Sequence, residues 1–220
     1  MTDGFEPDLT PRVVHPWVAE GQRRIRFAIS IFPQPADWRH FIRLVQQMEE
    51  WGYDGYYSYD HPTAHADCWT ALAALAATTE RIRLGTMVDC IYYRSPYLLA
   101  RQAADIDRLS GGRLVLGIGI GDWPHEFAQM GLTYPPVAVR QRGLEETIRI
   151  LRGLWSGQPF SFSGEQWSAS TDGSFLGPVQ QPHVPIILAG GGEKVTLRQV
   201  ARFADASNMG AHETIGSAVT

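Results

Sequence analysis

Strand-like and helix-like stretches alternate along most of this chain, and no other feature constrains its fold as strongly. Short apolar runs that end in glycine, proline or polar residues are followed by stretches in which apolar residues recur at helical spacing. We expect strands at residues 25–32, 54–61, 82–88, 113–119, 184–189 and 205–210. We expect helices at residues 37–52, 69–79, 96–110, 140–154 and 193–203. This order predicts a parallel sheet joined by right-handed helical crossovers.

Repeated strand and helix units favour a (β/α)8 barrel of the TIM type, in the α/β class. Such a barrel closes with eight strands, whereas about six β/α units can be counted here. We therefore expect a barrel truncated after about six units, with an open sheet as the alternative. Residues 1–24 are interpreted as an N-terminal extension, and residues 25–220 as the barrel domain with its C-terminal strands missing. Residues 156–182 break the rhythm and predict an inserted surface strand or hairpin.

Charge, cysteine content and hydropathy exclude several classes of protein. The net charge of −4 and the lack of a basic run argue against nucleic acid as a partner. The two cysteines, Cys68 and Cys90, form no C-x-x-C pair, which is typical of a reduced, cytoplasmic protein with free thiols. Residues 1–21 lack the pattern of a signal peptide, and no apolar run is long enough to span a membrane. We expect a soluble, cytoplasmic protein with no membrane partner.

The aromatic-rich strand at residues 54–61 ends in an acid and an imidazole, Asp60 and His61. Because α/β barrels carry function at the carboxyl ends of their strands, this pair is a candidate for chemistry. The alternative is an aspartate that closes a turn beside an incidental surface histidine. A metal site could also be read from His61, His65, Asp67 and Cys68, but the segment contains Pro62 and no ligand group follows another strand. We expect no metal.

Two glycine-rich stretches follow strands and have different interpretations. Gly117, Gly119 and Gly121 resemble a dinucleotide fingerprint, but Asp122 follows where a phosphate would lie. We interpret these glycines as permitting the close approach of a flat ring or of backbone.

The second stretch, at residues 190–194, joins a strand to a helix and offers consecutive backbone N–H groups beside Lys194, the chain's only lysine. This pattern favours phosphate binding. The alternative is a glycine-rich entry to a helix with a solvated lysine.

Several short motifs occur together and in a characteristic order: Tyr59-Asp60-His61, Arg83-Leu84-Gly85-Thr86, Tyr93-Arg94-Ser95-Pro96, a D-R-L-S-G-G-R-L-x-L-G-x-G run at residues 107–119, and Ala204-Asp205-Ala206-Ser207-Asn208. With them the chain resembles the bacterial luciferase-like monooxygenase superfamily. The run at residues 107–119 is the most specific of these motifs. The Asp-His ending of the second strand resembles the branch that uses the deazaflavin coenzyme F420.

The resemblance implies an oxidoreductase that transfers a hydride between an organic substrate and coenzyme F420. Asp60 and His61 would face the deazaflavin ring, with His61 as proton acceptor or electrostatic stabiliser and Asp122 as the complementary, buried acid. A cis peptide bond is expected between Met87 and Val88. The residues implied to bind the cofactor are Asp60, Thr86, Met87, Val88, Gly121, Ala189, Gly190, Gly191, Gly192 and Lys194, the last four at its phosphate tail.

Residues 62–65 depart from the sugar-phosphate dehydrogenases of this family, which have an aromatic residue soon after the Asp-His pair. A sugar phosphate is therefore not implied as the substrate. Two other functions remain open: an FMN-dependent luciferase-like monooxygenase, and an inactive truncated barrel fragment that acts only in binding or assembly. Such a fragment could form a homodimer through its exposed sheet edges.

Overall fold

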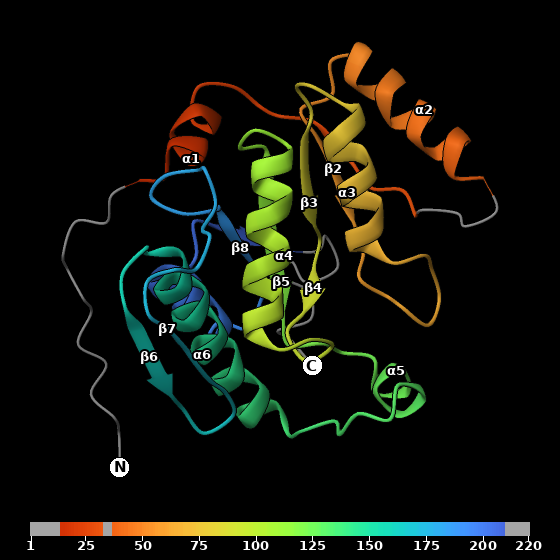
Figure 1. The fold of residues 1–220 in the computed structure, drawn as a ribbon. Coiled ribbons are helices and arrows are strands. Elements are labelled where there is room, and N and C mark those ends of the chain that lie inside the picture. The colour runs from red at the N-terminus through yellow and green to blue at the C-terminus, as the bar shows by residue number, and fades with distance from the viewer. Residues whose placement is uncertain (1–13, 33–36, 210–220) are drawn as a thin grey trace.

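The structure, a computed structural model, describes residues 14–32 and 37–209 (Figure 1). Its elements in chain order are α1 (Pro16–Gly21), β1 (Ala28–Ile29), α2 (Trp38–Glu50), β2 (Gly55–Ser58), α3 (Cys68–Thr78), β3 (Arg83–Thr86), β4 (Asp89–Cys90), α4 (Pro96–Leu109), β5 (Leu114–Gly119), α5 (Pro124–Gln129), α6 (Val137–Trp155), β6 (Phe160–Ser163), β7 (Ser168–Thr171), β8 (Ile186–Ala189), α7 (Thr196–Phe203) and β9 (Ala206–Asn208).

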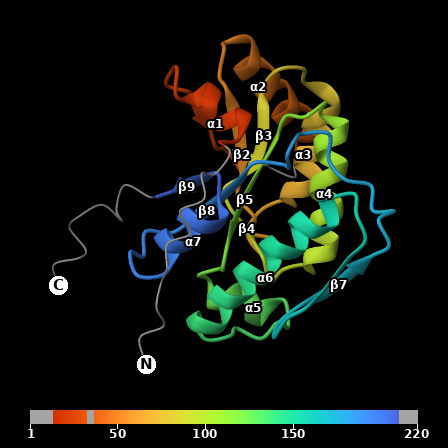
Figure 2. The ribbon, with the colours of Figure 1, turned by 90° about the vertical axis from the view of Figure 1, so that its left-hand side faces the viewer.

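The main sheet is parallel and runs in the order β1-β2-β3-β5-β8-β9, with β4 also paired to β5. The helices α2, α3, α4 and α6 lie along one face of this sheet (Figure 2). The predicted α/β architecture of repeated strand and helix units is confirmed. In the described part of the chain, no helix is long and apolar enough to cross a membrane.

Helix starts follow the capping residues of the sequence. The Asp37 carboxylate accepts a hydrogen bond from the His40 backbone N–H at 2.8 Å and begins α2. In the same way Asp67 caps α3, and Ser95 caps α4 just before its first residue, Pro96. These side chains satisfy N–H groups that have no partner within the helix. The expected starts of α2 and α4 are confirmed.

Other boundaries differ from the expected ones. The strand expected over residues 25–32 is reduced to Ala28–Ile29, which, among the strands that the structure describes, pairs with β2 alone. The helix expected from residue 193 begins at Thr196, after a turn, and the helix expected from residue 140 begins at Val137. Three short elements, α1, β4 and α5, were not expected at all. All three are too short to show a hydrophobic period in the sequence.

The two faces of β5 supply two different clusters. Leu114, Leu116 and Ile118 belong to the large core between the sheet and its helices. Val115 belongs to a small cluster on the opposite face with Tyr57 of β2 and Ile187 of β8. Successive residues of a strand point to opposite faces, so one strand serves both layers.

The most specific motif of the sequence holds the amino end of the sheet together. The buried Arg113 guanidinium donates hydrogen bonds to the carbonyl oxygens of Ala76, Thr79 and Ile82, and so binds the end of α3 to the start of β3. Asp107 accepts three hydrogen bonds from residues 179–180, which fixes the chain ahead of β8. This motif therefore has a structural role at the end of the sheet that lies away from the strand carboxyl ends.

The segment that breaks the β/α rhythm forms the antiparallel hairpin β6–β7, as predicted. Its tip is held by Glu146 of α6, whose carboxylate accepts backbone N–H groups of Glu165, Gln166 and Trp167 at 2.8–2.9 Å. One buried carboxylate thus replaces the hydrogen bonds that a neighbouring strand would supply.

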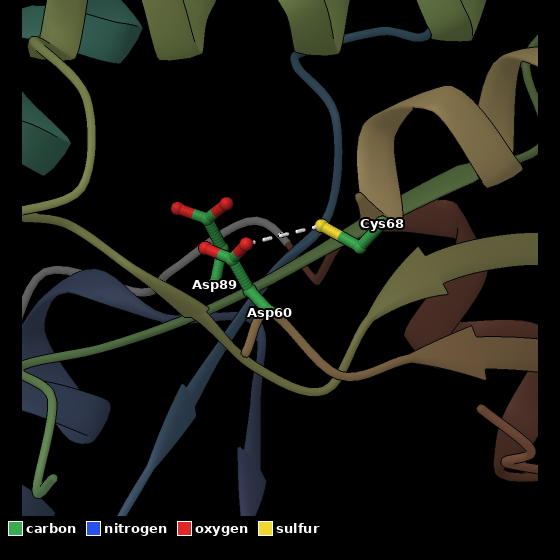
Figure 3. A group of neighbouring side chains, drawn as sticks. All are labelled: Asp60, Cys68 and Asp89. Carbon is green, nitrogen blue, oxygen red and sulfur yellow. Dashed lines mark hydrogen bonds between the residues drawn. The ribbon is translucent and has the colours of Figure 1, made fainter. Parts of the chain in front are cut away.

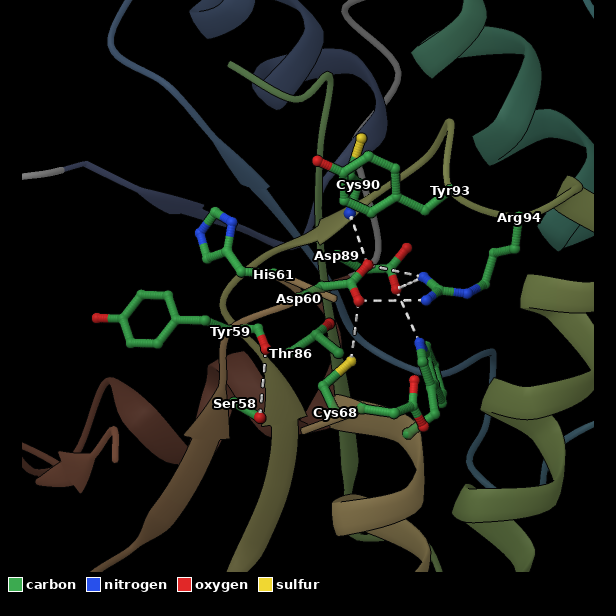
Figure 4. Close-up of polar contacts among 12 residues, drawn as sticks. Ser58, Tyr59, Asp60, His61, Cys68, Thr86, Asp89, Cys90, Tyr93 and Arg94 are labelled. Carbon is green, nitrogen blue, oxygen red and sulfur yellow. Dashed lines mark hydrogen bonds and ion pairs between the residues drawn. The ribbon is translucent and has the colours of Figure 1, made fainter. Parts of the chain in front are cut away.

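At the carboxyl end of the sheet a buried ion cluster joins four elements (Figure 3, Figure 4). Arg94, ahead of α4, donates to both oxygens of Asp60 at 2.8 and 3.2 Å and also pairs with Asp89 of β4. From α3, Trp69 Nε1 donates to Asp89 at 2.8 Å and Cys68 Sγ contacts Asp60 at 3.4 Å. Both carboxylates and the guanidinium lie almost wholly out of solvent.

The cluster contains two carboxyl groups and one guanidinium. Burial, and then the charge of Asp60, raise the pKa of Asp89 well above its ordinary value. Burial alone would lower the pKa of Arg94, but the charges of Asp89 and Asp60 outweigh it and raise that pKa. One negative charge shared between the two carboxyl groups would balance the guanidinium, and a cluster with no net charge is the favourable state for a buried site.

We predict that Asp60→Asn and Asp89→Asn affect stability unequally. Asp60→Asn should lower the free energy of unfolding by about 3 kcal/mol, because Arg94 would lose the carboxylate that accepts two of its hydrogen bonds in a buried site. Asp89→Asn should cost less than about 1 kcal/mol, because its amide oxygen can accept the same hydrogen bonds as a neutral acid. Urea unfolding followed by circular dichroism measures both. Equal losses would show that Asp89 is also ionised.

Candidate functional site

A cavity of about 530 Å³ opens at the carboxyl ends of the central strands. Its lining residues come from the ends of β2, β4, β5, β8 and β9 and from the segments that follow them: Tyr59, Asp60, His61, Met87, Val88, Asp89, Cys90, Tyr93, Gly119, Ile120, Gly121, Asp122, Trp123, Gln141, Ala189, Gly190, Thr196 and Asn208. The volume lies within the range typical of small-molecule sites. This end of the sheet is also where α/β barrels carry their active sites.

The structure brings most of the predicted site residues together around this cavity. Those that line it are Asp60, His61, Met87, Val88, Gly121, Asp122, Ala189 and Gly190. Those that are not part of its lining are Thr86, Gly191, Gly192 and Lys194. Thr86 is wholly buried and its hydroxyl donates to the carbonyl oxygen of Gly117 at 2.6 Å. That these residues bind a cofactor remains a prediction.

His61 is held on two sides. Its ring stacks on Trp123, with ring centroids 3.9 Å apart and an interplanar angle of 25°. Its Nδ1 lies 3.0 Å from Oε2 of Glu126, a residue of α5. The side chain is about one-fifth exposed, and Figure 4 shows it turned away from the ion cluster that its neighbour Asp60 joins. The imidazole is thus fixed in orientation and open to the cavity.

Glu126 is the acid that sequence reasoning missed. Its side chain is wholly buried and accepts hydrogen bonds from Thr63 Oγ1 at 2.8 Å and from the Tyr93 hydroxyl at 2.5 Å, besides its contact with His61. Burial by itself raises the pKa of Glu126, but the hydrogen bonds from Tyr93, His61 and Thr63 outweigh it and hold that pKa below its ordinary value. Burial and the bond to Glu126 raise the pKa of Tyr93, so its hydroxyl keeps its proton.

Asp122 lies at the cavity wall, but its expected burial is wrong because its side chain is exposed. The preceding Gly121 has a φ of +74°, and a Cβ there would lie 2.7 Å from Cys90 Sγ. The resulting turn leaves Asp122 outside and lets α5 bring Glu126 inward. The signal for Glu126 in the sequence was its place four residues after Asp122, in the first turn of a short helix.

The peptide bond between Met87 and Val88 is cis, as expected. The glycines opposite it serve close packing of backbone, one of the two interpretations given for them. A Cβ on Gly117 would lie 2.2 Å from the carbonyl oxygen of Thr86, and one on Gly119 would lie 2.9 Å from a methyl carbon of Val88. Side chains larger than hydrogen at these positions would displace the cavity wall.

The glycine-rich loop after β8 differs from its expected form. It does not lead directly into a helix, since a turn over residues 193–195 separates Gly192 from Thr196. The Gly190 N–H already donates to the carbonyl oxygen of Asn208 at 3.1 Å, so it is not free for a phosphate. Lys194 is exposed.

His61, His65, Asp67 and Cys68, which could be read from the sequence as a metal site, make different contacts in the structure. His65 stacks on Phe32 with ring centroids 3.7 Å apart, and Asp67 caps α3. Ligand atoms of Asp60, Cys68 and Asp89 do lie within 4.8 Å of one another (Figure 3). Arg94, however, already supplies the positive charge between the two carboxyl groups. Burial, then the nearby carboxylates, raise the pKa of the Cys68 thiol well above its ordinary value, which disfavours the thiolate that a metal requires.

Known proteins resemble this chain in sequence and in fold. An F420-dependent glucose-6-phosphate dehydrogenase of Kineococcus radiotolerans is 36% identical over 158 residues, which cover 68% of this chain and 46% of that protein. The crystal structure of monooxygenase RslO1 from Streptomyces bottropensis matches with a TM-score of 0.71 at 26% identity, over 81% of this chain and 57% of that one.

A coenzyme F420-dependent tetrahydromethanopterin reductase from Methanopyrus kandleri matches with a TM-score of 0.75 at 22% identity, over 84% of this chain and 56% of that one. The similarity in fold confirms the predicted barrel type. This chain covers about half of that longer, barrel-type chain. The chain likewise spans about half the length of the curated relatives that it matches.

The family model described as luciferase-like monooxygenase matches residues 13–218, nearly the whole chain. The match includes every strand of the main sheet and every residue around the cavity. The predicted resemblance is therefore confirmed, and the chain belongs to the luciferase-like monooxygenase family.

Proposed function

We propose that this chain forms the cofactor site of an oxidoreductase that transfers a hydride between a small organic substrate and coenzyme F420. The observation that carries the proposal is His61, an imidazole open to the cavity and backed by the buried carboxylate of Glu126. Hydride removal from an alcohol carbon also requires removal of the hydroxyl proton, and an oriented imidazole is suited to accept it. The F420-dependent relative at 36% identity supports the choice of cofactor.

The cavity wall fits a flat ring system. Gly119, Gly121 and Gly190 all line it, so no side chain projects into the cavity at three points around it. We propose that the ring lies against Met87 and Val88, with Ala189 and Gly190 at its edge. A phosphate tail would continue toward Gly191, Gly192 and Lys194, outside the cavity. When bound, the deazaflavin would supply the site that accepts or donates the hydride.

The protein's own groups would manage the proton and the orientation of the substrate. In the oxidation direction, a substrate hydroxyl would give its proton to His61 as the hydride leaves the adjacent carbon, and the reverse reaction would return it. Asp60 would act by anchoring the backbone ahead of His61 through its ion pair with Arg94. Thr86 would act by fixing the strand that carries Gly117. Asp122, at the mouth, would meet the substrate or the solvent around it.

The second candidate is an FMN-dependent monooxygenase, favoured by the match to the monooxygenase RslO1 at 26% identity. In that case the same strand ends would hold the isoalloxazine ring, and reduced flavin would activate dioxygen. We propose a cytoplasmic location for either activity, because both cysteines are free, buried thiols.

We predict that the purified chain binds F420 at least about tenfold more tightly than FMN. Titration of each cofactor, followed by its fluorescence, gives the two dissociation constants. Tighter binding of FMN together with oxygen-dependent turnover would replace the proposal with the monooxygenase. Binding of neither cofactor would leave a protein that acts only in binding or assembly.

We predict that His61→Ala lowers the rate of hydride transfer to F420 by about 10²–10⁴-fold, the range that a general acid or base typically contributes. The unfolding midpoint should change little, because the ring is partly exposed. The matched control is His40→Ala, an exposed histidine on α2 far along the chain from the cavity residues. Stopped-flow absorbance of F420 measures the rate, and equal rates for the two variants would exclude His61 from the reaction.

A further inference from the structure

The two ring nitrogens of His61 have different surroundings. Nδ1 lies 3.0 Å from Oε2 of Glu126. Nε2 makes no hydrogen bond to any of the residues that the structure describes, and the partly exposed ring lines the cavity. A neutral imidazole has one N–H donor and one acceptor nitrogen, so the position of its single proton decides what His61 can do.

A count of donors around Glu126 decides where that proton lies. Thr63 donates to Oε1, and Tyr93 donates to Oε2. Tyr93 keeps its proton, and an ionised carboxylate can only accept. The third contact, from His61, is therefore favourable only if Nδ1 carries a hydrogen. The opposite tautomer would place the Nδ1 lone pair 3.0 Å from an oxygen of a wholly buried carboxylate.

The ring has little freedom to escape this arrangement. Trp123 stacks on it with ring centroids 3.9 Å apart, which limits rotation of the imidazole about its side-chain bonds. Other groups near the ring include Tyr59, at 6.3 Å between ring centroids, His65, which interacts electrostatically with His61, and Asp122, on the same cavity wall. Asp60 is turned toward Arg94 instead (Figure 4). Glu126 is thus the one described acid with a hydrogen bond to His61.

We propose that Glu126 is a positioning residue that keeps the proton of neutral His61 on Nδ1 and so presents the Nε2 lone pair to the cavity. The idea deepens the proposed function, because a lone pair on Nε2 can take a substrate proton. It does not depend on that function for its test, since the tautomer is set in the protein without cofactor.

The test is ¹⁵N and ¹³C nuclear magnetic resonance on histidine-labelled, cofactor-free protein, at a pH where the ring is neutral. The His61 signals are assigned by their loss in His61→Ala. In the unmodified protein we expect one tautomer with hydrogen on Nδ1. In Glu126→Ala we expect that tautomer to lose its dominance and the Nε2–H form to become the major one.

Two further variants make the outcome decisive. Glu126→Leu fills the buried volume without offering an acceptor, so we expect the same change of tautomer as in Glu126→Ala. It also provides the test if Glu126→Ala does not fold. Glu50→Gln, an exposed change on α2, should leave the His61 signals as they are. Hydrogen on Nε2 in the unmodified protein, or an unchanged tautomer in the folded Glu126 variants, would overturn the proposal. Failure to bind F420 would overturn the proposed function alone.

Discussion

The burial of one guanidinium between two carboxyl groups is the constraint from which the carboxyl end of this sheet is built. Arg94 lies just ahead of α4, Asp60 just after β2, and Asp89 in β4. A buried charge is costly unless it is paired, so these three segments have to meet. The next residue after Asp60 is His61, and its place in the cavity wall is a direct consequence of that pairing.

The two ends of the sheet divide structure from chemistry. At the amino end, Arg113 donates hydrogen bonds to backbone carbonyl oxygens of neighbouring segments, and Asp107 accepts hydrogen bonds from backbone N–H groups. At the carboxyl end, His61 keeps one ring nitrogen without a partner among the described residues, although Glu126 and Tyr93 beside it are hydrogen-bonded to each other. The motif at residues 107–119 therefore stabilises the fold, while the segment around Glu126 contributes to the candidate site.

Local signals made much of the fold predictable from sequence. Helix-start signals, such as the cap Asp37 and the first-position Pro96, act within a few positions of themselves, and the apolar run of β5 and the apolar period of α6 extend over several residues. His61 could be found because it ends a strand. Glu126 offered only a weak signal, an acid in the first turn of a short helix, because its partners lie 33 to 65 positions away and the helix is too short to show a period. Asp122 was favoured by motif position alone, and one glycine with positive φ turned it outward.

The separation of His61 and Glu126 by 65 positions also sets an order of events during synthesis. A ribosome that adds about 5–20 residues per second would make Glu126 roughly 3 to 13 seconds after His61. During that interval the imidazole has no carboxylate behind it, and the strands of β2 and β3 can pair without a formed site. The buried partner of His61 therefore becomes available when α5 is made, before β8 and β9 of the same sheet exist.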